Sequence, residues 1–325
     1  MCRLCSASGV NVKPLKRTLT AAGCALLLGG ALPALAASSE QVHQEHPHDV
    51  LFGISRGSDG LIAVGTGGEL RRSADGKAWT IQAATAPGTS LFDVSERQGR
   101  LLAVGQEGEI FRNAGEGWQE VDAPTRDRLF AVAQGEMGRA VATGAFGTVL
   151  YSKDGGASWT QAEIDWPALI GQDYQPHVYN VSFDARGRVF IVGEFGLIAR
   201  SDDGGQSWTS LHQGDASLFG FALSDSGLAY AVGQSGTVLR SRDGGDSWAA
   251  IDSGNEAILM DVAIRPDGKA VATGIRQAIS IAPEANRAEN LHHDLFLENW
   301  YSDVAVLGNE FYAVGQFARV VKISL

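Results

Sequence analysis

The sequence predicts an all-β repeat protein on three observations: a phrase that recurs in seven units, four strand-like runs in each unit, and turn residues between the runs. In its fullest form the phrase reads A-V-G-x-x-G-x-L-x-R-S-x-D-G-G-x-S-W. Its first glycine recurs at spacings of 40, 39, 49, 40, 41 and 41 residues, at Gly65, Gly105, Gly144, Gly193, Gly233, Gly274 and Gly315. Four strands in a repeat of about forty residues are typical of a β-propeller blade. We therefore predict a seven-bladed β-propeller of four-stranded antiparallel blades over residues 37–325.

The second repeat shows the four runs clearly, as "LFDVSE", "LLAVGQ", "EIFRN" and "WQEVDA", with Gly, Asp or Asn between runs. The seventh repeat has three runs, "SDVAVLG", "FYAVGQ" and "RVVKISL", and is one strand short. We expect the segment "SSEQVHQEHP", which begins at Ser38, to supply the missing outer strand of the last blade. Such a strand closes the ring and removes its open edges.

The first 36 residues have the features of a secretory signal peptide. A basic segment at Lys13–Arg17 precedes an apolar stretch, and small residues follow at Ala34–Ala36. An uncleaved membrane anchor and a lipoprotein signal at Cys24 are the alternatives. We predict cleavage near Ala36, a periplasmic location and no membrane span in the mature chain. Cleavage also removes every cysteine, namely Cys2, Cys5 and Cys24, which fits a large core that needs no disulfide.

The charge of the chain excludes one class of function. The whole chain has 26 Lys and Arg against 37 Asp and Glu. The predicted leader carries four of the basic residues and no acidic one, which leaves 22 basic against 37 acidic residues. Nucleic-acid binding needs a net basic face, so we expect no nucleic-acid partner.

An octamer ends the phrase in its most regular copies, "SKDGGASW", "SDDGGQSW" and "SRDGGDSW". In a hairpin its Ser and Asp can bond turn amides, its glycines can take positive φ, and its Trp can pack into the blade. It holds no nucleophile beside a base, so we interpret it as structural. The predicted structural residues are Ser73, Asp75, Trp79, Ser152, Asp154, Gly156, Trp159, Ser201, Asp203, Gly205, Trp208, Ser241, Asp243, Gly245 and Trp248.

This octamer is an Asp-box, S-x-D-x-G-x-[ST]-W, which also occurs in sialidases. The longer phrase, with A-V-G-x-x-G before the box and an Arg directly before its Ser, resembles the photosystem II stability and assembly factor family over nearly all of the mature chain. That resemblance implies a non-catalytic propeller that docks on a membrane protein or its assembly intermediate, through an arginine patch on the Asp-box side. In a non-photosynthetic bacterium the client would be another complex of the cell envelope.

The position seven residues after each repeat glycine is the candidate for such a patch. It holds Arg72, Arg112, Tyr151, Arg200, Arg240, Ile281 and Lys322. Basic side chains there can recognise carboxylates of a partner or lipid phosphates. Alternatively, each Arg lies over its own Trp or pairs with an Asp of the neighbouring blade. We predict Arg72, Arg112, Arg200, Arg240 and Lys322 as partner-binding residues.

A second contact candidate is the longest connection between repeats. About ten extra residues separate the third and fourth repeats and carry Trp166 and Tyr174, which we also predict to bind the partner. The alternative is a lid packed on the neighbouring blade.

Three further hypotheses concern catalysis and metal binding. A sialidase-like glycoside hydrolase or a glycan-binding propeller is the alternative function, but the F/Y-R-I-P entry motif of sialidases does not occur. Acidic and amide residues recur at one register of the innermost strands, where we expect them either to hold a cation or to bond turn amides. They are Asp93, Asn180, Asp261 and Asp303. Histidines with metal-like spacing are His43, His46, His48, His292 and His293. We predict a monomeric non-enzyme without metal or cofactor.

Overall fold

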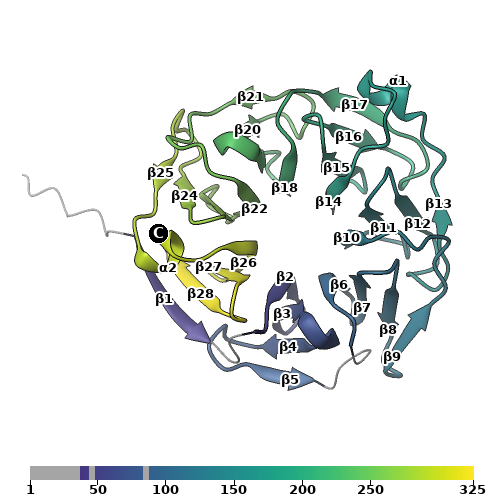
Figure 1. Cartoon of the computed structure of the whole chain (residues 1–325), viewed down its shortest axis with the longest axis horizontal. Helices are drawn as coiled ribbons and strands as arrows, with labels where there is room; N and C mark the ends of the chain where they lie inside the picture. The colour runs from purple at the N-terminus through teal and green to yellow at the C-terminus, as the bar shows by residue number, and fades with distance from the viewer. Residues whose placement is uncertain (1–36, 44–47, 83–87) are drawn as a thin grey trace, which may run out of the picture. The chain divides into compact units, whose positions relative to one another are not determined.

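The computed structural model describes residues 37–43, 48–82 and 88–325, and every structural statement below concerns these residues. They form seven four-stranded antiparallel sheets around a central opening (Figure 1). The predicted seven-bladed β-propeller is thus confirmed. The leader proposed at residues 1–36 lies outside the described residues. None of the described helices is long and apolar enough to cross a membrane.

The strands follow the chain from the inside of each blade to its rim. Blade one has β2 (Leu51–Gly57), β3 (Gly60–Gly65), β4 (Leu70–Ser73) and β5 (Thr80–Gln82). Blade two has β6 (Leu91–Arg97), β7 (Arg100–Gly105), β8 (Ile110–Asn113) and β9 (Trp118–Val121). Blade three has β10 (Leu129–Gln134), β11 (Ala140–Gly144), β12 (Val149–Ser152) and β13 (Thr160–Gln161). Blade four has β14 (Val178–Phe183), β15 (Val189–Gly193), β16 (Ile198–Ser201) and β17 (Thr209–His212).

The remaining blades follow the same order. Blade five has β18 (Leu218–Leu223), β19 (Ala229–Gly233), β20 (Val238–Ser241) and β21 (Ala249–Ala250). Blade six has β22 (Leu259–Ile264), β23 (Ala270–Gly274), β24 (Ala278–Ile281) and β25 (Glu289–Asn290). Blade seven has β26 (Tyr301–Leu307), β27 (Glu310–Gly315), β28 (Val320–Ser324) and, at its rim, β1 (Ser38–His43). Short helices are α1 (Trp166–Ile170), α2 (Asp294–Leu297), η1 (Thr66–Gly68) and η2 (Gln234–Gly236).

The ring is closed by the first strand of the described chain. β1 runs antiparallel to β28, with Ser38 opposite Ser324 and Gln41 opposite Val321. Figure 1 shows β1 beside β28 at the rim of blade seven. The prediction that an N-terminal strand completes the last blade is therefore confirmed.

The hydrophobic core lies between neighbouring blades. All five residues of β11, and likewise of β15, are buried. One cluster joins Val141 and Val149 of blade three to Val181 and Ile191 of blade four. A single blade cannot bury its faces alone, so stacking around the ring supplies the core.

The repeat glycine is explained by a close approach of two backbone segments. It ends the second strand of each blade, where the connection from the preceding blade passes. A Cβ atom on Gly65 would collide with the carbonyl oxygen of Val50, and one on Gly144 with that of Arg128. Only glycine leaves room at this position, which is why the residue marks the period so regularly.

Each innermost strand carries a β-bulge. In blade one Leu51 pairs with Gly65 and Gly53 with Val64, so Phe52 is an extra residue without a partner. The same shift occurs in all seven blades. The bulged residues are Phe52, Phe92, Phe130, Tyr179, Phe219, Met260 and Ser302.

The two ends of a blade are formed by different turns. At one end the turn between the first and second strands meets the octamer turn, as where the Gly155 amide donates to Gly138 O (2.7 Å). We call this the Asp-box end. At the other end the connection between blades meets the turn after the second strand, as where the Ala145 amide donates to Arg128 O (2.9 Å). The bulges lie near this second end, which we call the bulge end.

Candidate functional site

The octamer at Ser152–Trp159 uses its polar groups within its own turn. The Ser152 hydroxyl accepts from the Gly156 amide (2.9 Å) and donates to Asp154 Oδ1 (2.8 Å). Asp154 also accepts from the Ser158 amide (2.9 Å) and hydroxyl (2.5 Å). Trp159 Nε1 donates to Gly156 O (3.1 Å). The copies that begin at Ser201 and Ser241 repeat these contacts, and nothing in them is arranged as a nucleophile with a base.

The hydrogen bonds also set the ionisation of the box aspartates. Partial burial acts to raise the pKa of Asp154, but the bonds from Ser158 and Ser152 outweigh it and bring that pKa down to about 2. The bonds from Ser247, followed by that from Ser241, lower the pKa of Asp243 to about 2. Hydrogen bonding to the charged form is the cause in both turns.

The second glycine of the octamer is where the preceding blade packs. Gly245 has φ 89°, in the left-handed region. A Cβ atom there would lie 2.6 Å from Cε1 of Phe190 in blade four. The glycine therefore serves the turn and the blade interface together.

The predicted partner-binding arginines lie on the third strand of their blades and reach toward the next blade. Arg72 Nη1 lies 3.4 Å from Glu96 Oε2, and Arg112 Nε donates to Gly155 O (3.0 Å). Arg240 Nη1 donates to Ala285 O (2.5 Å) and Pro283 O (3.3 Å). Lys322 instead stays in its own blade, 3.4 Å from Glu310 and 3.7 Å from Glu40. Arg72 thus meets a glutamate of the next blade, whereas Arg112 and Arg240 meet backbone carbonyl oxygens there. Pairing with an aspartate of the next blade, the expected alternative, occurs at Arg200.

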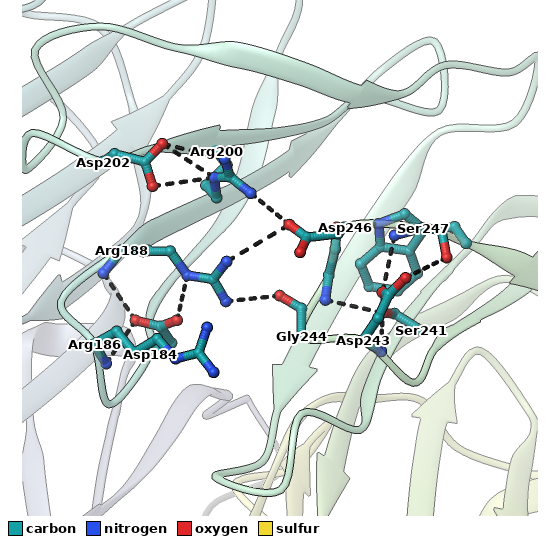
Figure 2. A network of polar contacts seen from close by, with 12 residues as sticks. Asp184, Arg186, Arg188, Arg200, Asp202, Ser241, Asp243, Gly244, Asp246 and Ser247 are labelled. Atoms are coloured by element: carbon teal, nitrogen blue, oxygen red, sulfur yellow. Dashed lines mark hydrogen bonds and ion pairs between the residues drawn. The ribbon is translucent and has the colours of Figure 1, made fainter.

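Arg200 belongs to a network at the junction of blades four and five (Figure 2). Its guanidinium lies 2.5 Å from Asp246 and 3.1 Å from Asp202. Arg188 also approaches Asp246 (3.6 Å), pairs with Asp184 (2.6 Å) and donates to Gly244 O (2.9 Å). Carboxylates therefore compensate both arginines at this junction.

In blade six the predicted position equivalent to the basic residues was wrong by one residue. The turn after Gly274 is one residue shorter than in the other blades, so Ser280 pairs with Val271 at the position of the basic residues. Ile281 lies one step further along β24 and is buried. In blade three Tyr151 holds the predicted position, and Lys153 Nζ lies 5.4 Å from the centre of its ring.

A second basic register was missed. The residue five before each repeat glycine begins the second strand, or directly precedes it, at the Asp-box end; these residues are Gly60, Arg100, Arg139, Arg188, Leu228, Lys269 and Glu310. Arg139 Nε and Cδ lie over the octamer glycine Gly204 of blade four. Arg139 is equivalent to Arg188, but Gly135 and Gln206 replace the carboxylates Asp184 and Asp246. Counting backwards from the glycine finds this register in the sequence.

Basic residues of the two registers, with two basic neighbours, form a cluster on blades two and three. We define this basic cluster as Arg97, Arg100, Arg112, Arg139 and Lys153. Burial, and then the positive charges of Arg112 and Arg97, lower the pKa of Arg100. Arg97 pairs with Glu136 (3.1 Å) and Lys153 donates to Gln206 Oε1 (2.8 Å). In the described part of the chain, Arg100, Arg112 and Arg139 have no carboxylate partner. Arg139 and Lys153 line a hollow of about 380 Å³ between blades three and four.

The long connection lies at the bulge end, away from the arginine registers. Trp166 begins α1 and is 5% exposed, packed over Gly147 in the core between blades three and four. Tyr174 is 44% exposed and meets Phe195 edge to face at 5.6 Å. Together with Phe146 they line a hollow of about 450 Å³. The structure therefore does not bring the two predicted groups of partner-binding residues together.

The acidic register of the innermost strands joins blades. Asp93 Oδ2 accepts from the Val132 amide of blade three (2.8 Å), and Asp261 Oδ2 from the Val304 amide of blade seven (3.1 Å). Burial, with the charge of Asp303 in addition, raises the pKa of Asp93 to about 8. Burial also raises the pKa values of Asp261 and Asp303. Asn180 lines the channel at the same register.

Among the described residues no group of three or more His, Cys, Asp or Glu is placed to hold a metal ion. His293 instead caps α2, where its Nδ1 accepts from the Leu295 amide (3.2 Å). His46 lies outside the described residues.

Fold and site together define a class: a seven-bladed propeller whose blades are joined by octamer turns and by arginines that reach across to the next blade. The family model described as photosynthesis system II assembly factor YCF48 matches residues 111–278, about half of the chain. The chain belongs to this family. Among curated proteins none matches the sequence.

Solved structures with the same fold include two family members. YCF48 from Cyanidioschyzon merolae has 16% identity and a TM-score of 0.69, covering 88% of this chain and 98% of its own. A structure of YCF48 bound to D1 peptide has 14% identity and a TM-score of 0.66, covering 91% and 97%. Virginiamycin B lyase from Staphylococcus aureus has 11% identity and a TM-score of 0.76, covering 89% and 99%. At these identities the likeness shows the fold alone.

Proposed function

We propose that this protein is an exported, monomeric, non-catalytic assembly factor that binds an acidic segment of a membrane protein of the cell envelope. The contact is made by the basic cluster at the Asp-box end. Membership of the YCF48 family supports a role in assembly. A relative of the same fold has been solved with a D1 peptide bound, which supports the capture of a protein segment.

One observation carries the proposal: arginines at equivalent positions differ in whether a carboxylate compensates them. Arg200 meets Asp202 and Asp246, whereas among the described residues Arg112 donates to the carbonyl oxygen of Gly155 and meets no carboxylate. Arg139 likewise lacks the carboxylates that hold its equivalent Arg188. An uncompensated guanidinium presents a planar fork of donors that fits a carboxylate. Arg112 and Arg139 therefore place uncompensated basic charge on blades two and three.

The other predicted partner-binding residues contribute less to the proposed contact. Arg72, Arg200 and Lys322 already have carboxylate partners. Arg240 meets carbonyl oxygens and Asn286 Oδ1, so it keeps its charge and extends the surface toward blades five and six. Tyr174 lies at the bulge end and can contact only a client that reaches around the ring.

Export is part of the proposal. β1 begins at Ser38, two residues after the proposed cleavage site at Ala36, so cleavage leaves the ring-closing strand intact. N-terminal sequencing of the protein from a periplasmic fraction should return a chain beginning near Ala37. An intact N-terminus in the membrane fraction would contradict this.

The experiment is capture of solubilised envelope proteins on the tagged chain from Ala37, with the partner identified by mass spectrometry and its affinity then measured directly. The variant Arg112→Glu/Arg139→Glu should lose the partner with at least a tenfold drop in affinity, on the order of 1.4 kcal/mol or more. Arg200→Glu is the matched control, because that arginine is already neutralised. Equal capture by all three proteins would overturn the proposal, as would a loss confined to Arg200→Glu.

A further inference from the structure

Aromatic residues predominate at the mouth of the central channel at the bulge end. The central channel holds a cavity of about 740 Å³, and all seven bulged residues line it. A bulge re-aims a side chain, and bulges are frequent next to binding sites. Because of it, two consecutive residues such as Phe92 and Asp93, or Tyr179 and Asn180, line the same cavity.

Five of the seven bulged residues are aromatic, and neighbours touch around the mouth. Phe52 meets Phe92 edge to face, with ring centres 5.1 Å apart. Tyr179 lies between Phe130 (5.4 Å) and Phe219 (4.8 Å). All five are half-buried, so one part of each ring remains accessible. Blades six and seven contribute no aromatic ring to the mouth, since their bulged residues are Met260 and Ser302.

One of these aromatic rings already has a cation–π contact with a basic residue of the protein. The exposed guanidinium of Arg128 lies over the ring of Phe92, 5.4 Å from its centre. Aromatic faces attract cations through their quadrupole, more strongly as water is removed. A side chain that enters the mouth meets the same kind of face with less water around it.

The channel below the rings is lined by carboxyl groups. Its described lining includes six carboxylates against one basic residue, Arg97; the carboxylates are Asp93, Glu136, Asp184, Asp225, Asp261 and Asp303. Arg97 compensates Glu136, and Arg188 compensates Asp184. Burial raises the pKa of Asp93 to about 8 and raises the pKa values of Asp261 and Asp303, so Asp225 is the described lining carboxylate that keeps an uncompensated charge. A positive occupant favours the ionised form of the buried aspartates, whereas an anion disfavours it.

We propose that the bulge-end mouth of the channel binds the guanidinium or ammonium group of an arginine or lysine side chain, carried by an extended peptide segment. The rings hold the cation, and carboxyl groups line the channel behind them. A cavity of this volume is large enough for such a segment. Arg97 of the basic cluster also lines the channel, but the rings lie at the opposite end of the blades from the octamer turns. One propeller therefore engages acidic sequence at the Asp-box end and basic sequence at the bulge end.

The test uses three heptapeptides, Gly-Ser-Gly-X-Gly-Ser-Gly, with a neutral fluorophore and an amidated C-terminus, where X is arginine, citrulline or leucine. Citrulline keeps the shape of arginine and removes its charge. Fluorescence anisotropy of each probe is followed as the chain from Ala37 is added. The arginine probe should bind about tenfold or more tightly than either neutral probe.

The variant Tyr179→Leu/Phe219→Leu should weaken binding of the arginine probe by about tenfold. Met260 at the equivalent position of blade six shows that the bulge accepts an aliphatic side chain. Phe130→Leu is the second variant if the double variant unfolds at a lower temperature. Phe146→Leu is the matched control, an exposed aromatic residue at the same end that does not line the channel.

The outcomes separate clearly. Equal affinity for arginine and citrulline probes overturns recognition of a cation, and tighter binding of the leucine probe assigns the mouth to apolar side chains. An equal loss in Phe146→Leu removes the site from the channel. The absence of measurable binding by any probe overturns the proposal as a whole. None of these results depends on Arg112 or Arg139, so the proposed function is judged separately.

Discussion

Asp303 Oδ2 accepts a hydrogen bond from the backbone amide of Ile54 at 2.7 Å, which joins the last blade to the first across 249 residues of sequence. Asp303 Oδ1 accepts from its own neighbour, the Val304 amide (2.7 Å). The ring is therefore closed twice: by this side chain at the channel and by β1 against β28 at the rim. The two closures lie at the innermost and outermost strands of the same blade.

Deletion of residues 38–48 tests the outer closure. The deletion removes the pairing of β1 with β28 and exposes the edge of β28. We expect the melting temperature to fall by about 8 °C or more, since several backbone bonds of about 1 kcal/mol each are lost. Circular dichroism and light scattering would follow unfolding and association. An unchanged melting temperature would show that β1 contributes nothing to closure.

The raised pKa of Asp93 predicts that stability falls as pH rises. Between its ordinary value of 3.8 and about 8, folded Asp93 holds a proton that the unfolded chain has released. Each rise in pH in this window therefore favours unfolding. Asp261 and Asp303 act in the same direction. Thermal unfolding measured from pH 5 to pH 8 should show a melting temperature that declines by several degrees.

Asp93→Asn is the variant that isolates this effect. Its side chain stays uncharged at all pH values, so the decline with pH should become shallower. Its one carbonyl oxygen can accept from the Val132 or the Val94 amide but not from both, which lowers stability at pH 5 by about 1 kcal/mol. A slope identical to that of the parent protein would assign the proton to another group.

The octamer should contribute to stability through its buried serine. Ser201 is fully buried and accepts from the Gly205 amide at 2.8 Å. Ser201→Ala leaves that amide without a partner, which costs about 1–3 kcal/mol, or roughly 3–8 °C in melting temperature. Ser207→Ala is the control, because its exposed hydroxyl loses a bond to Asp203 that water can replace. Equal losses in the two variants would contradict a buried structural role.

Phe146 predicts a measurable backbone effect. It has φ 54° and is 58% exposed, so a bulky residue adopts the left-handed region on a turn. Phe146→Gly and Phe146→Ala both remove the ring, but only glycine adopts this φ without strain. Urea unfolding should place the glycine variant about 1 kcal/mol above the alanine variant. The reverse order would show that the turn rearranges.

The blade count could be predicted because one steric demand recurs in every blade. Gly65 and Gly144 both occupy a close approach of two backbones, which no other residue tolerates. The register error at Ile281 has the opposite cause, since a turn shortened by one residue leaves no mark in the glycine spacing. Equal spacing from a landmark is reliable only when the intervening turn keeps its length.

The charge of the candidate site could not be predicted from the repeat alone. Arg139 and Arg188 look alike in the sequence, and they differ because Gly135 and Gln206 stand where Asp184 and Asp246 would compensate the charge. One of these residues lies in the same blade and the other in the next. The bulges were also hidden, because an unpaired residue becomes visible only when the register of both strands is known.

The pairing of β1 with β28 also has a consequence for how the molecule is made. The nascent chain delivers β1 first and β28 after the other strands of the ring. Until residues 320–324 are available, any blades that have formed leave their terminal edge strands unpaired, because β1 has no partner. Domains generally fold as units during or after synthesis, and exposed edges favour association. The interval between the first and the last strand is therefore the period in which this propeller needs protection from other chains.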